Sequence, residues 1–435
     1  MTTTYDPFHP AYLDEGDLRA ELTRVYDLCH GCRLCFKFCT AFPTLFEAID
    51  RHDDQDAARL TNAEQDQVGD ECFGCKLCYV NCPYTPGRHE WELDFPRLMM
   101  RAVQVRHRSD RRSLTQRMAD QALGRTDLVG RVNVALAPLA NRAIGATGGV
   151  ARRTMETVVG IAAERLLPPY ARQRFSTWFR RRVSPAIPDP QGQVTVFPTC
   201  LVEYQEPGIG RDLVKVYERN RVQCSLPDGL RCCGAPWLHT GDVERFVRQA
   251  GGNIEVLAAE VRAGREIVVP QPTCSYVLKH DYPDYVGGAD AELVAEHIHD
   301  SSDYLWTRLH KGEDADFDIE FPGDVPESTT YHAPCHLRAQ NIGLKSRDLL
   351  KLTGTEVQLV AECSAIDGTW GYRADNYEIS RKVAHKMAKA IDSAESQAVA
   401  GDCHLANGGI LQETGRKPVH PLQQLARAYD IAEET

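Results

Sequence analysis

The sequence has little of what marks an exported or membrane-spanning protein. No run of residues approaches the roughly 18 consecutive apolar side chains that a membrane span needs. The N-terminal stretch MTTTYDPFHPAYLDEGD contains neither the basic region nor the apolar core of a secretory signal. We therefore expect a cytoplasmic protein, with peripheral attachment to the cytoplasmic face of the inner membrane as an open alternative.

The chain also lacks a recognisable loop for a flavin or nicotinamide dinucleotide. The stretch GATGG at residues 145–149 is rich in glycine, but its glycines do not follow the pattern G-x-G-x-x-G and no strand pattern precedes it. We interpret it as a turn. If this chain handles electrons, another protein must supply them.

Lysine is absent from residues 101–185, where arginine is abundant. This stretch holds 17 Arg and five acidic residues, so its net charge is +12, within a chain whose total is −11. Its apolar residues recur at helical intervals, which predicts a basic helical segment. Such a segment can dock on an anionic membrane surface or an acidic partner, or it can be a solvated linker. With few aromatic residues and no binding motif, it does not indicate a nucleic-acid partner.

Cysteine, in contrast, is plentiful, with 16 residues among 435. In a reducing compartment, thiolates at short regular spacing are metal ligands more often than disulfide partners. The pattern C-x2-C-x2-C-x3-C occurs twice, at residues 29–39 and 72–82. In two-cluster ferredoxins, the first three cysteines of each run bind one cubane and the fourth binds the other.

We therefore predict two [4Fe–4S] clusters. One is held by Cys29, Cys32, Cys35 and Cys82, and the other by Cys72, Cys75, Cys78 and Cys39. The alternative is a pair of zinc sites, but zinc needs only four thiolates and does not explain a doubled pattern of eight. The spacer 40–71 has helical patterning, which indicates a helical ferredoxin domain of the kind found in respiratory subunits.

From about residue 190, strand patterns alternate with helical patterns, and the order repeats after roughly 120 residues. VTVFPTC, RCCGAP and EIVVPQPTC in the first copy correspond to TTYHAPC, ECSAID and QAVAGDC in the second. Cysteines that end parallel strands meet at the carboxyl edge of a sheet. The first copy gathers Cys200, Cys232, Cys233 and Cys274, and the second gathers Cys335, Cys363 and Cys403.

The first set of four thiols is suited to an iron–sulfur cluster, with a structural zinc site or a vicinal dithiol for thiol exchange as alternatives. Cys224 lies outside the repeat pattern and is expected to be a buried apolar residue. His297 and His420 stand at predicted helix starts, where capping or packing is the expected role. We assign them no chemistry.

The two ferredoxin runs, followed in order by DLVGRVNVALAPLANRA, RCCGAP, YHAPCHL, GTWGYRADNY and HPLQQLA, resemble the CCG-domain iron–sulfur oxidoreductases. That family includes the C subunits of anaerobic glycerol-3-phosphate dehydrogenases, glycolate- and lactate-oxidising iron–sulfur subunits, and the B and C subunits of heterodisulfide reductase. The resemblance implies that the CCG repeats hold noncubane iron–sulfur clusters or a metal, next to a flavoprotein partner or a quinone.

The resemblance assigns Cys200, Cys232, Cys233 and Cys274 to the first CCG site, without the family's usual fifth cysteine. The second repeat departs further, because CCG has become Cys363-Ser364-Ala365 and the terminal CxxC ends in Ala406. Its three cysteines can hold a cluster with His404, His336 or His332 as the fourth ligand, zinc as Cys3His, or nothing.

The expected fold is multidomain, α plus α/β. It comprises a helical ferredoxin domain with two [4Fe–4S] clusters at 1–100, a basic helical segment at 101–189, a first CCG repeat at 190–315 and a degenerate second repeat at 316–435. The expected function is an electron-transfer subunit that passes electrons from a flavoprotein dehydrogenase, of glycerol-3-phosphate or 2-hydroxy-acid type, toward quinone or another acceptor. We expect no catalytic residue of its own.

Three other functions stay open. The first CCG site can be a catalytic disulfide or thiol reductase fed by the cubanes. The chain can donate electrons to a rubrerythrin-like peroxidase. The α/β repeats can instead be a zinc-bound docking scaffold.

Overall fold

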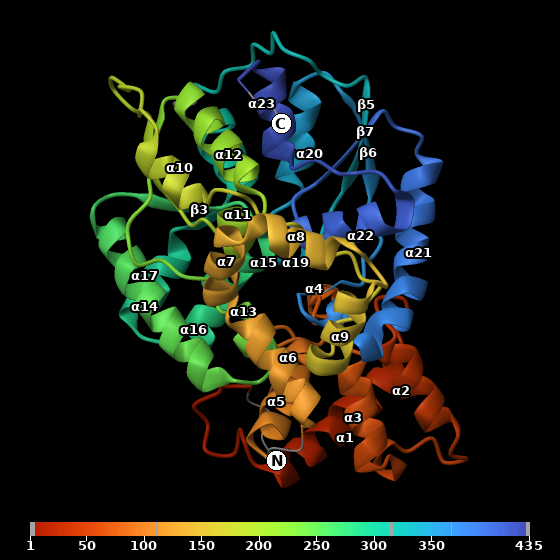
Figure 1. Ribbon diagram of the computed structural model, residues 1–435. Coiled ribbons are helices and arrows are strands. Elements are labelled where there is room, and N and C mark those ends of the chain that lie inside the picture. The colour runs from red at the N-terminus through yellow and green to blue at the C-terminus, as the bar shows by residue number, and fades with distance from the viewer. Residues whose placement is uncertain (1–4, 110–111, 313–315, 367, 432–435) are drawn as a thin grey trace. The chain divides into compact units, whose positions relative to one another are not determined.

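The computed structural model describes residues 5–109, 112–312, 316–366 and 368–431 (Figure 1). The chain forms two compact units. Unit 1 comprises residues 1–114 with 236–244, and unit 2 comprises residues 115–235 with 245–435. Among the described residues, no helix is long and apolar enough to cross a membrane.

Unit 1 is helical and carries both cysteine runs. Its main helices are α1 (Glu15–Cys32), α2 (Ala41–Asp50), α3 (Asn62–Asp70), the short α4 (Leu77–Asn81) and α5 (Phe95–Arg108). Their apolar faces form one core that includes Leu22, Tyr26, Phe42, Ile49 and Leu98. The predicted helices of the 40–71 spacer are present as α2 and α3. The N-terminal part is therefore a helical domain, as predicted.

Local sequence signals fix the ends of these helices. Asp14 caps α1 by accepting a hydrogen bond from the Asp17 N–H. Thr61 and Glu64 form a capping box at the start of α3, in which each side chain accepts from the other residue's backbone N–H. These caps satisfy backbone donors that a helix start leaves without partners.

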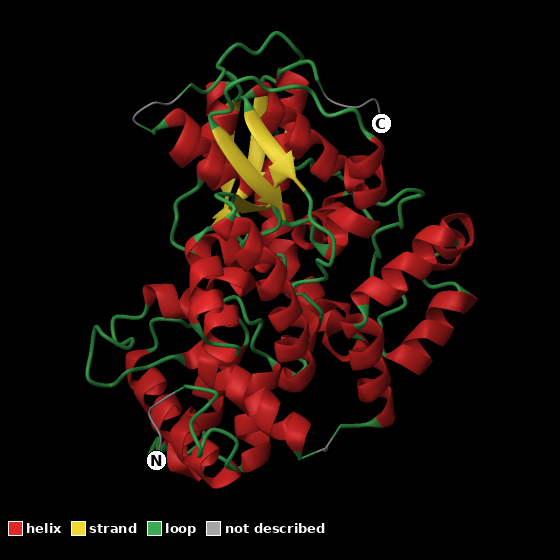
Figure 2. Cartoon of the chain, turned by 90° about the vertical axis from the view of Figure 1, so that its left-hand side faces the viewer, coloured by secondary structure: helices red, strands yellow, loops and turns green. Residues whose placement is uncertain are grey.

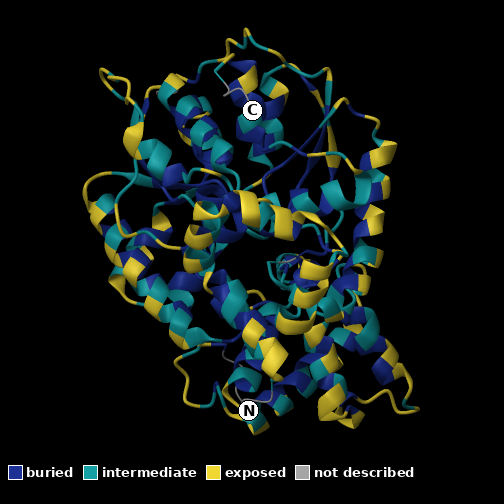
Figure 3. Cartoon of the chain, in the orientation of Figure 1, coloured by how far each residue is buried: buried dark blue, intermediate teal, exposed yellow. Residues whose placement is uncertain are grey.

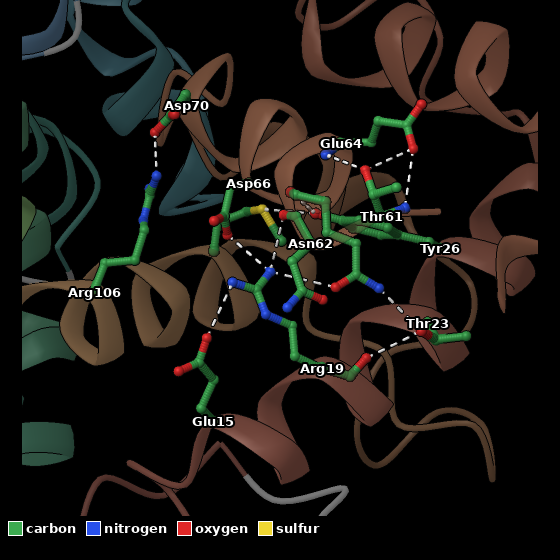
Figure 4. Close-up of polar contacts among 12 residues, drawn as sticks. Glu15, Arg19, Thr23, Tyr26, Thr61, Asn62, Glu64, Asp66, Asp70 and Arg106 are labelled. Atoms are coloured by element: carbon green, nitrogen blue, oxygen red, sulfur yellow. Dashed lines mark hydrogen bonds and ion pairs between the residues drawn. The ribbon is translucent and has the colours of Figure 1, made fainter. Parts of the chain in front are cut away.

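Polar contacts connect the helices on each side of the cysteine loops, as Figure 4 shows. Arg19 of α1 pairs with Asp66 of α3 at 2.8 Å, and Arg106 of α5 pairs with Asp70 at 2.6 Å. The hydroxyl of Tyr26 donates to the carbonyl of Gln65 at 3.1 Å. Helix α3 is thereby fixed to both α1 and α5 immediately before the second cysteine run begins.

Unit 2 contains two parallel sheets, one for each predicted repeat, and all the described strands (Figure 2). The first sheet has the order β2-β1-β3-β4, with β1 at Gly192–Val196, β2 at Val222–Ser225, β3 at Glu266–Val269 and β4 at Ile298–Asp300. The second has the order β6-β5-β7, with β5 at Ser328–His332, β6 at Glu356–Val360 and β7 at Ala398–Gly401. The expected pair of α/β repeats is present.

Helices connect and cover these strands. In the first repeat they are α11 (Cys200–Tyr204), α12 (Pro207–Arg219), α14 (Val243–Arg262), α15 (Pro272–Tyr276) and α17 (Ala289–Glu296). In the second they are α19 (Cys335–Ala339), α20 (Lys345–Leu352), α21 (Tyr377–Ser393), α22 (His404–Thr414) and α23 (Pro421–Ala428). Helices α12, α20 and α23 contribute Leu213, Leu349 and Leu425 to one shared core. The two repeats therefore share a hydrophobic core.

The arginine-rich stretch is helical, as predicted, with α6 (Leu114–Gly124), α7 (Thr126–Ala135), α8 (Ala137–Gly145), α9 (Val150–Val159) and α10 (Phe175–Arg181). The alternative of a solvated linker is wrong. Residues after α9 bond to the second repeat, since Ala162 N–H donates to the Tyr372 carbonyl at 2.9 Å. The guanidinium of Arg165 is 1% exposed and donates to the Ser380 hydroxyl at 2.7 Å. From residue 115 onward the stretch is part of unit 2, whereas its residues 101–114 belong to unit 1.

Helix α7 approaches the first repeat closely because one of its residues is glycine. A Cβ at Gly130 would lie 2.4 Å from the ring of Tyr204 on α11, too close for any side chain. Gly145, the last residue of α8, has no heavy atom within 4 Å of the same position. The close contact between the backbone of Gly130 and the ring of Tyr204 therefore fixes how α7 lies on the first repeat.

We predict that Gly130→Ala destabilises unit 2 by about 1–3 kcal/mol, because the added methyl group must displace a buried ring. Gly145→Ala is the matched control and should leave stability unchanged or slightly raised, since alanine favours helix. Thermal unfolding followed by circular dichroism under anaerobic conditions measures both. Equal melting temperatures for the two variants would contradict the prediction.

Candidate metal centres

The eight cysteines of unit 1 lie at helix ends and in the loops between them. Cys29 and Cys32 are in the last turn of α1, and Cys35 and Cys39 follow before α2. Cys72 and Cys75 follow α3, Cys78 is in α4, and Cys82 is the C-cap of α4. Gly74, between the first two cysteines of the second run, has φ of 63°. That left-handed conformation favours glycine, and it lets the loop turn back on itself.

The structure brings three thiols of the first run together with the last thiol of the second run. Burial and then the charges of Cys35, Cys82 and Cys32 raise the pKa of Cys29. Burial, followed by the charges of Cys82, Cys32 and Cys75, raises the pKa of Cys35 to about 12. Cys82 thus acts on two thiols of the first run, as the predicted grouping requires.

A second group contains the other four thiols. Burial and then the charges of Cys72 and Cys75 raise the pKa of Cys39. Burial raises the pKa of Cys78 as well, and the charges of Cys75, Cys72, Cys39 and Cys35 add to it. The fourth cysteine of the first run therefore lies with the second run. The charge of Cys75 in the second group also raises the pKa of Cys35 in the first group, so the two groups are neighbours.

Both groups have the chemistry that an iron–sulfur cluster requires. Each supplies four thiols, and burial makes the thiolate forms of Cys29, Cys39 and Cys78 costly unless a positive charge such as iron compensates them. Backbone N–H groups of Gly74 and Tyr84 donate to the sulfurs of Cys72 and Cys82 at 3.5 and 3.4 Å. Such hydrogen bonds to sulfur tune the potential of a bound cluster. The ligand assignment itself stays a prediction.

In the first repeat, four thiols form a continuous chain at the carboxyl edge of the sheet. Cys200 begins α11 after β1, Cys232 and Cys233 follow β2, and Cys274 lies in α15 after β3. Hydrogen bonding from Cys200 and Cys233 lowers the pKa of Cys232. Hydrogen bonding to Cys232 and Cys274 raises the pKa of Cys233. The structure therefore brings together the four residues predicted for this site.

The peptide of the vicinal cysteine pair is held by surrounding side chains. Gln249 donates to the Cys232 carbonyl at 2.6 Å, and Tyr282 donates to the Cys233 carbonyl at 3.0 Å. The carboxylate of Asp127 on α7 accepts the Cys232 N–H at 3.0 Å. These three hydrogen bonds fix the peptide of the pair.

Asp127 is a site residue that sequence reasoning missed. Its carboxylate also accepts a hydrogen bond from the Tyr204 hydroxyl at 3.1 Å. Burial and then the charge of Cys232 raise the pKa of Asp127. The available signal was its position in DLVGRVNVALAPLANRA, a motif that we associated with the family but not with the first site.

A cavity of about 360 Å³ opens beside Cys200 and Cys232. Its wall is polar, and most of its charged residues are paired. Arg174 lies 3.7 Å from Glu203, and Arg180 is paired with Asp228. A small polar molecule could reach the first site through this cavity.

In the second repeat, the three predicted cysteines again follow strand ends. Cys335 begins α19 after β5, Cys363 follows β6, and Cys403 is the N-cap of α22 after β7. The N–H of Ala365 donates to the Cys363 sulfur at 3.3 Å. Burial raises the pKa of Cys403. The parallel strands thus direct all three residues to one sheet edge.

The first repeat also contributes to the second site. Gln271, three residues before Cys274, donates through Nε2 to the Cys403 sulfur at 3.2 Å and accepts the His404 N–H at 3.2 Å. The hydroxyl of Thr273 lies 3.0 Å from Nδ1 of His336. The segment that carries Cys274 therefore lies directly against the second site.

The histidines have different roles. His420 caps α23, because its Nδ1 accepts the Leu422 N–H at 3.2 Å, as expected for a histidine at a helix start. His297 follows the end of α17, so its prediction as a helix start is wrong. Its carbonyl accepts the Ile267 N–H at the edge of β3. Cys224 is a buried residue of β2, 8% exposed, as expected for an apolar role.

Within the described ranges, no three Cys, His, Asp or Glu side chains are already arranged to hold a single metal ion. The ligand sets are therefore inferred from the interactions between thiols and from the ends of the strands.

Comparisons with known proteins agree with this arrangement. The model of a 4Fe-4S dicluster domain matches residues 21–107, and the model of the cysteine-rich domain CCG matches residues 194–279 and 329–405. The chain is 28% identical over 309 residues to the C subunit of anaerobic glycerol-3-phosphate dehydrogenase of Escherichia coli, covering 70% of this chain and 76% of the relative.

Two other relatives cover less of this chain. The B subunit of fumarate reductase (CoM/CoB) of Methanothermobacter marburgensis is 29% identical over 224 residues, covering 49% of this chain and 41% of the relative. Lactate utilization protein A of Bacillus pumilus is 25% identical over 240 residues, covering 52% of this chain and 94% of the relative.

Two double variants test the interleaved thiol groups of unit 1. Cys29→Ser with Cys82→Ser removes two ligands from one predicted cluster, so about four irons should be lost and the other cluster should remain. Cys29→Ser with Cys39→Ser removes one ligand from each cluster, so about eight irons should be lost. Iron and acid-labile sulfide per chain, after anaerobic purification, give the result. If each run bound its own cluster, the two outcomes would be exchanged.

Proposed function

On the premise that this chain belongs to the CCG-domain iron–sulfur oxidoreductases, we propose that it is an electron-transfer subunit of a dehydrogenase complex. The observation that carries the proposal is the pair of neighbouring four-thiol groups in unit 1. Two clusters held there would lie close together, which suits single-electron transfer between them. The match to a 4Fe-4S dicluster domain supports iron–sulfur clusters in this region.

The electron donor is a separate flavoprotein dehydrogenase. The name of the glycerol-3-phosphate dehydrogenase relative, as one subunit among others, indicates a complex with a redox partner. Lactate utilization protein A suggests that a 2-hydroxy acid is an alternative substrate of that partner. The partner's flavin would take two electrons, and the two clusters would accept them one at a time. The acceptor is a quinone or another carrier.

The chain's own residues would control this relay by excluding water and by donating to sulfur. Cys75 and Cys78 are 6% and 8% exposed. The N–H groups of Gly74 and Tyr84 donate to cysteine sulfurs, one in each four-thiol group. Both effects set the potential at which a cluster accepts an electron.

A membrane surface is the proposed place where the electrons leave. Helices α7 and α8 expose an apolar stripe formed by Leu128, Val132, Leu136 and Leu139, whose exposed fractions are 58%, 50%, 51% and 69%. Figure 3 shows exposed residues along both helices. Arg125 and Arg142 beside the stripe are also exposed. Exposed leucines flanked by arginines suit an anionic lipid surface, where the apolar side chains insert and the cations contact headgroups.

We predict that the purified chain cosediments with vesicles containing phosphatidylglycerol and does so less at high salt. Leu136→Ser with Leu139→Ser should lower the affinity about tenfold, because two apolar side chains no longer insert. Val183→Ser with Ile319→Ser is the control, since these residues are 94% and 64% exposed outside the stripe. Equal loss of binding in both variants would remove the stripe from the proposal.

A second candidate function is a disulfide reductase at the first CCG site. The specific observation in its favour is the cavity beside Cys200 and Cys232. The eroded second repeat, in which Ser364 stands in place of a cysteine, argues against a two-site reductase.

The relay and the reductase differ in what the chain does alone. We expect dithionite-reduced protein, freed of excess dithionite, to be reoxidised by a water-soluble naphthoquinone and to show no sustained turnover of an organic disulfide with dithionite present. The visible absorbance of the clusters and free thiol release measure the two reactions. Sustained thiol release that is lost in Cys232→Ser would instead establish the reductase.

A further inference from the structure

His332 occupies the point from which the three cysteine-bearing segments of the second repeat leave the sheet. It is the last residue of β5, the central strand, and it pairs with Val360 of β6 on one side and Gly401 of β7 on the other. Cys335 follows His332 by three residues along the same segment. Cys363 follows Val360 by three residues, and Cys403 follows Gly401 by two.

The imidazole of His332 is buried, and only one of its two ring nitrogens has a hydrogen-bond partner that the structure describes. His332 is 2% exposed. Its Nε2–H donates to the carbonyl of Glu362 at 3.0 Å, immediately before Cys363. Its other ring nitrogen, Nδ1, is buried and has no hydrogen-bond partner among the described residues. Leaving a buried nitrogen without a partner is costly, so Nδ1 is available to bind a ligand.

This arrangement matches a metal-binding histidine. Such a residue commonly donates one ring N–H to a backbone carbonyl, which fixes the ring and leaves the other nitrogen free for the metal. Here the carbonyl belongs to the residue next to a predicted thiolate ligand. One hydrogen bond thus couples the position of the imidazole to that of Cys363.

Comparison of the two repeats shows a compensating exchange. When Cys200 is aligned with Cys335, Phe197 takes the place of His332, and Phe197 is a fully buried apolar residue. When Cys232 is aligned with Cys363, Cys233 takes the place of Ser364. At these aligned positions the first repeat has a phenylalanine and a second cysteine, whereas the second repeat has a histidine and a serine.

The other two histidines near the site fit less well. His336 has its Nδ1 3.0 Å from the Thr273 hydroxyl, so that nitrogen already has a partner. His404 also has a buried Nε2 without a partner in the described part of the chain. It lies in the first turn of α22, however, and not at the end of the central strand between the other two strands. His404 is the rival that an experiment must exclude.

We propose that Nδ1 of His332 is the fourth ligand of a metal centre whose other ligands are the thiolates of Cys335, Cys363 and Cys403. Three thiolates and one neutral imidazole form a complete four-ligand set for zinc. The same set can hold an iron–sulfur cluster in which one iron has a nitrogen ligand, which raises the reduction potential. In both cases the site has no open position for a substrate. The proposal concerns the second repeat alone and is separate from the electron relay proposed for unit 1.

The test uses the full chain, purified anaerobically, with zinc, iron and acid-labile sulfide measured per chain. His332→Gln should lose the metal of the second site, and its affinity for added Zn²⁺ or for reconstituting iron should fall at least tenfold. His332→Cys should restore the metal by supplying a fourth thiolate. His404→Gln, the matched control, should equal the wild type. Loss of zinc identifies a zinc centre, and loss of iron with sulfide identifies a cluster.

Metal content equal to that of the wild type in His332→Gln, or loss of metal in His404→Gln instead, would overturn the assignment. Loss of the unit 1 clusters in His332→Gln would indicate general misfolding. X-ray absorption of the wild-type chain at the zinc edge, or nitrogen couplings of a histidine-labelled sample in pulsed EPR of an iron centre, then decides the question without any variant. Absence of a histidine nitrogen at both metals would also overturn it.

Discussion

Burying a cysteine thiolate without a compensating positive charge is costly, and this cost governs the organisation of the protein. Every thiol group described here is assembled from chain segments that are distant in sequence, and each is held together by contacts among residues outside the thiol group. In unit 1 these contacts are the ion pairs that fix α3 to α1 and α5. In unit 2 they are parallel strands whose carboxyl ends meet at one edge. The fold supplies the positions, and a bound metal would supply the charge that lets the thiols ionise.

Spacing in the sequence predicted the features that depend on near neighbours or on strict repeats. The two cysteine runs predicted an interleaved grouping of thiols, which stays a prediction, and the repeated strand–cysteine pattern predicted the two parallel sheets that the structure contains. Contacts between distant residues could not be predicted in this way. Nothing local indicates that Asp127 accepts the Cys232 N–H, or that Gly130 lies against the Tyr204 ring. The error at His297 has the same cause, since the residue ends a short helix that precedes β4, and a helix end is poorly marked without a glycine or proline.

The two CCG repeats have diverged in a way that makes them chemically unequal. The first keeps the vicinal pair Cys232-Cys233, an adjacent cavity and a nearby carboxylate from Asp127. The second has Ser364 in the pair and receives Gln271 from the first repeat as a donor to Cys403. A hydrogen bond to a thiolate stabilises its charged form, so the first repeat helps to maintain the second site. The second edge therefore has polar contacts around its cysteines, which supports the closed metal centre proposed for it.

Several contacts in the arginine-rich segment suit arginine and not lysine. Several of its guanidinium groups are structural and buried. Arg152 is fully buried and donates from one nitrogen, Nη2, to the carbonyls of both Ala162 and Arg165 at 2.7 Å. Arg165 donates to Gln412 and Ser380 while its guanidinium lies over the Tyr377 ring, 4.7 Å from its centroid. A planar guanidinium can make several such bonds at once and stack on a ring, whereas a lysine ammonium cannot match that geometry and is costlier to bury. The same segment thus holds the second repeat through buried arginines and also has arginines at its surface, so part of its positive charge serves the packing of unit 2.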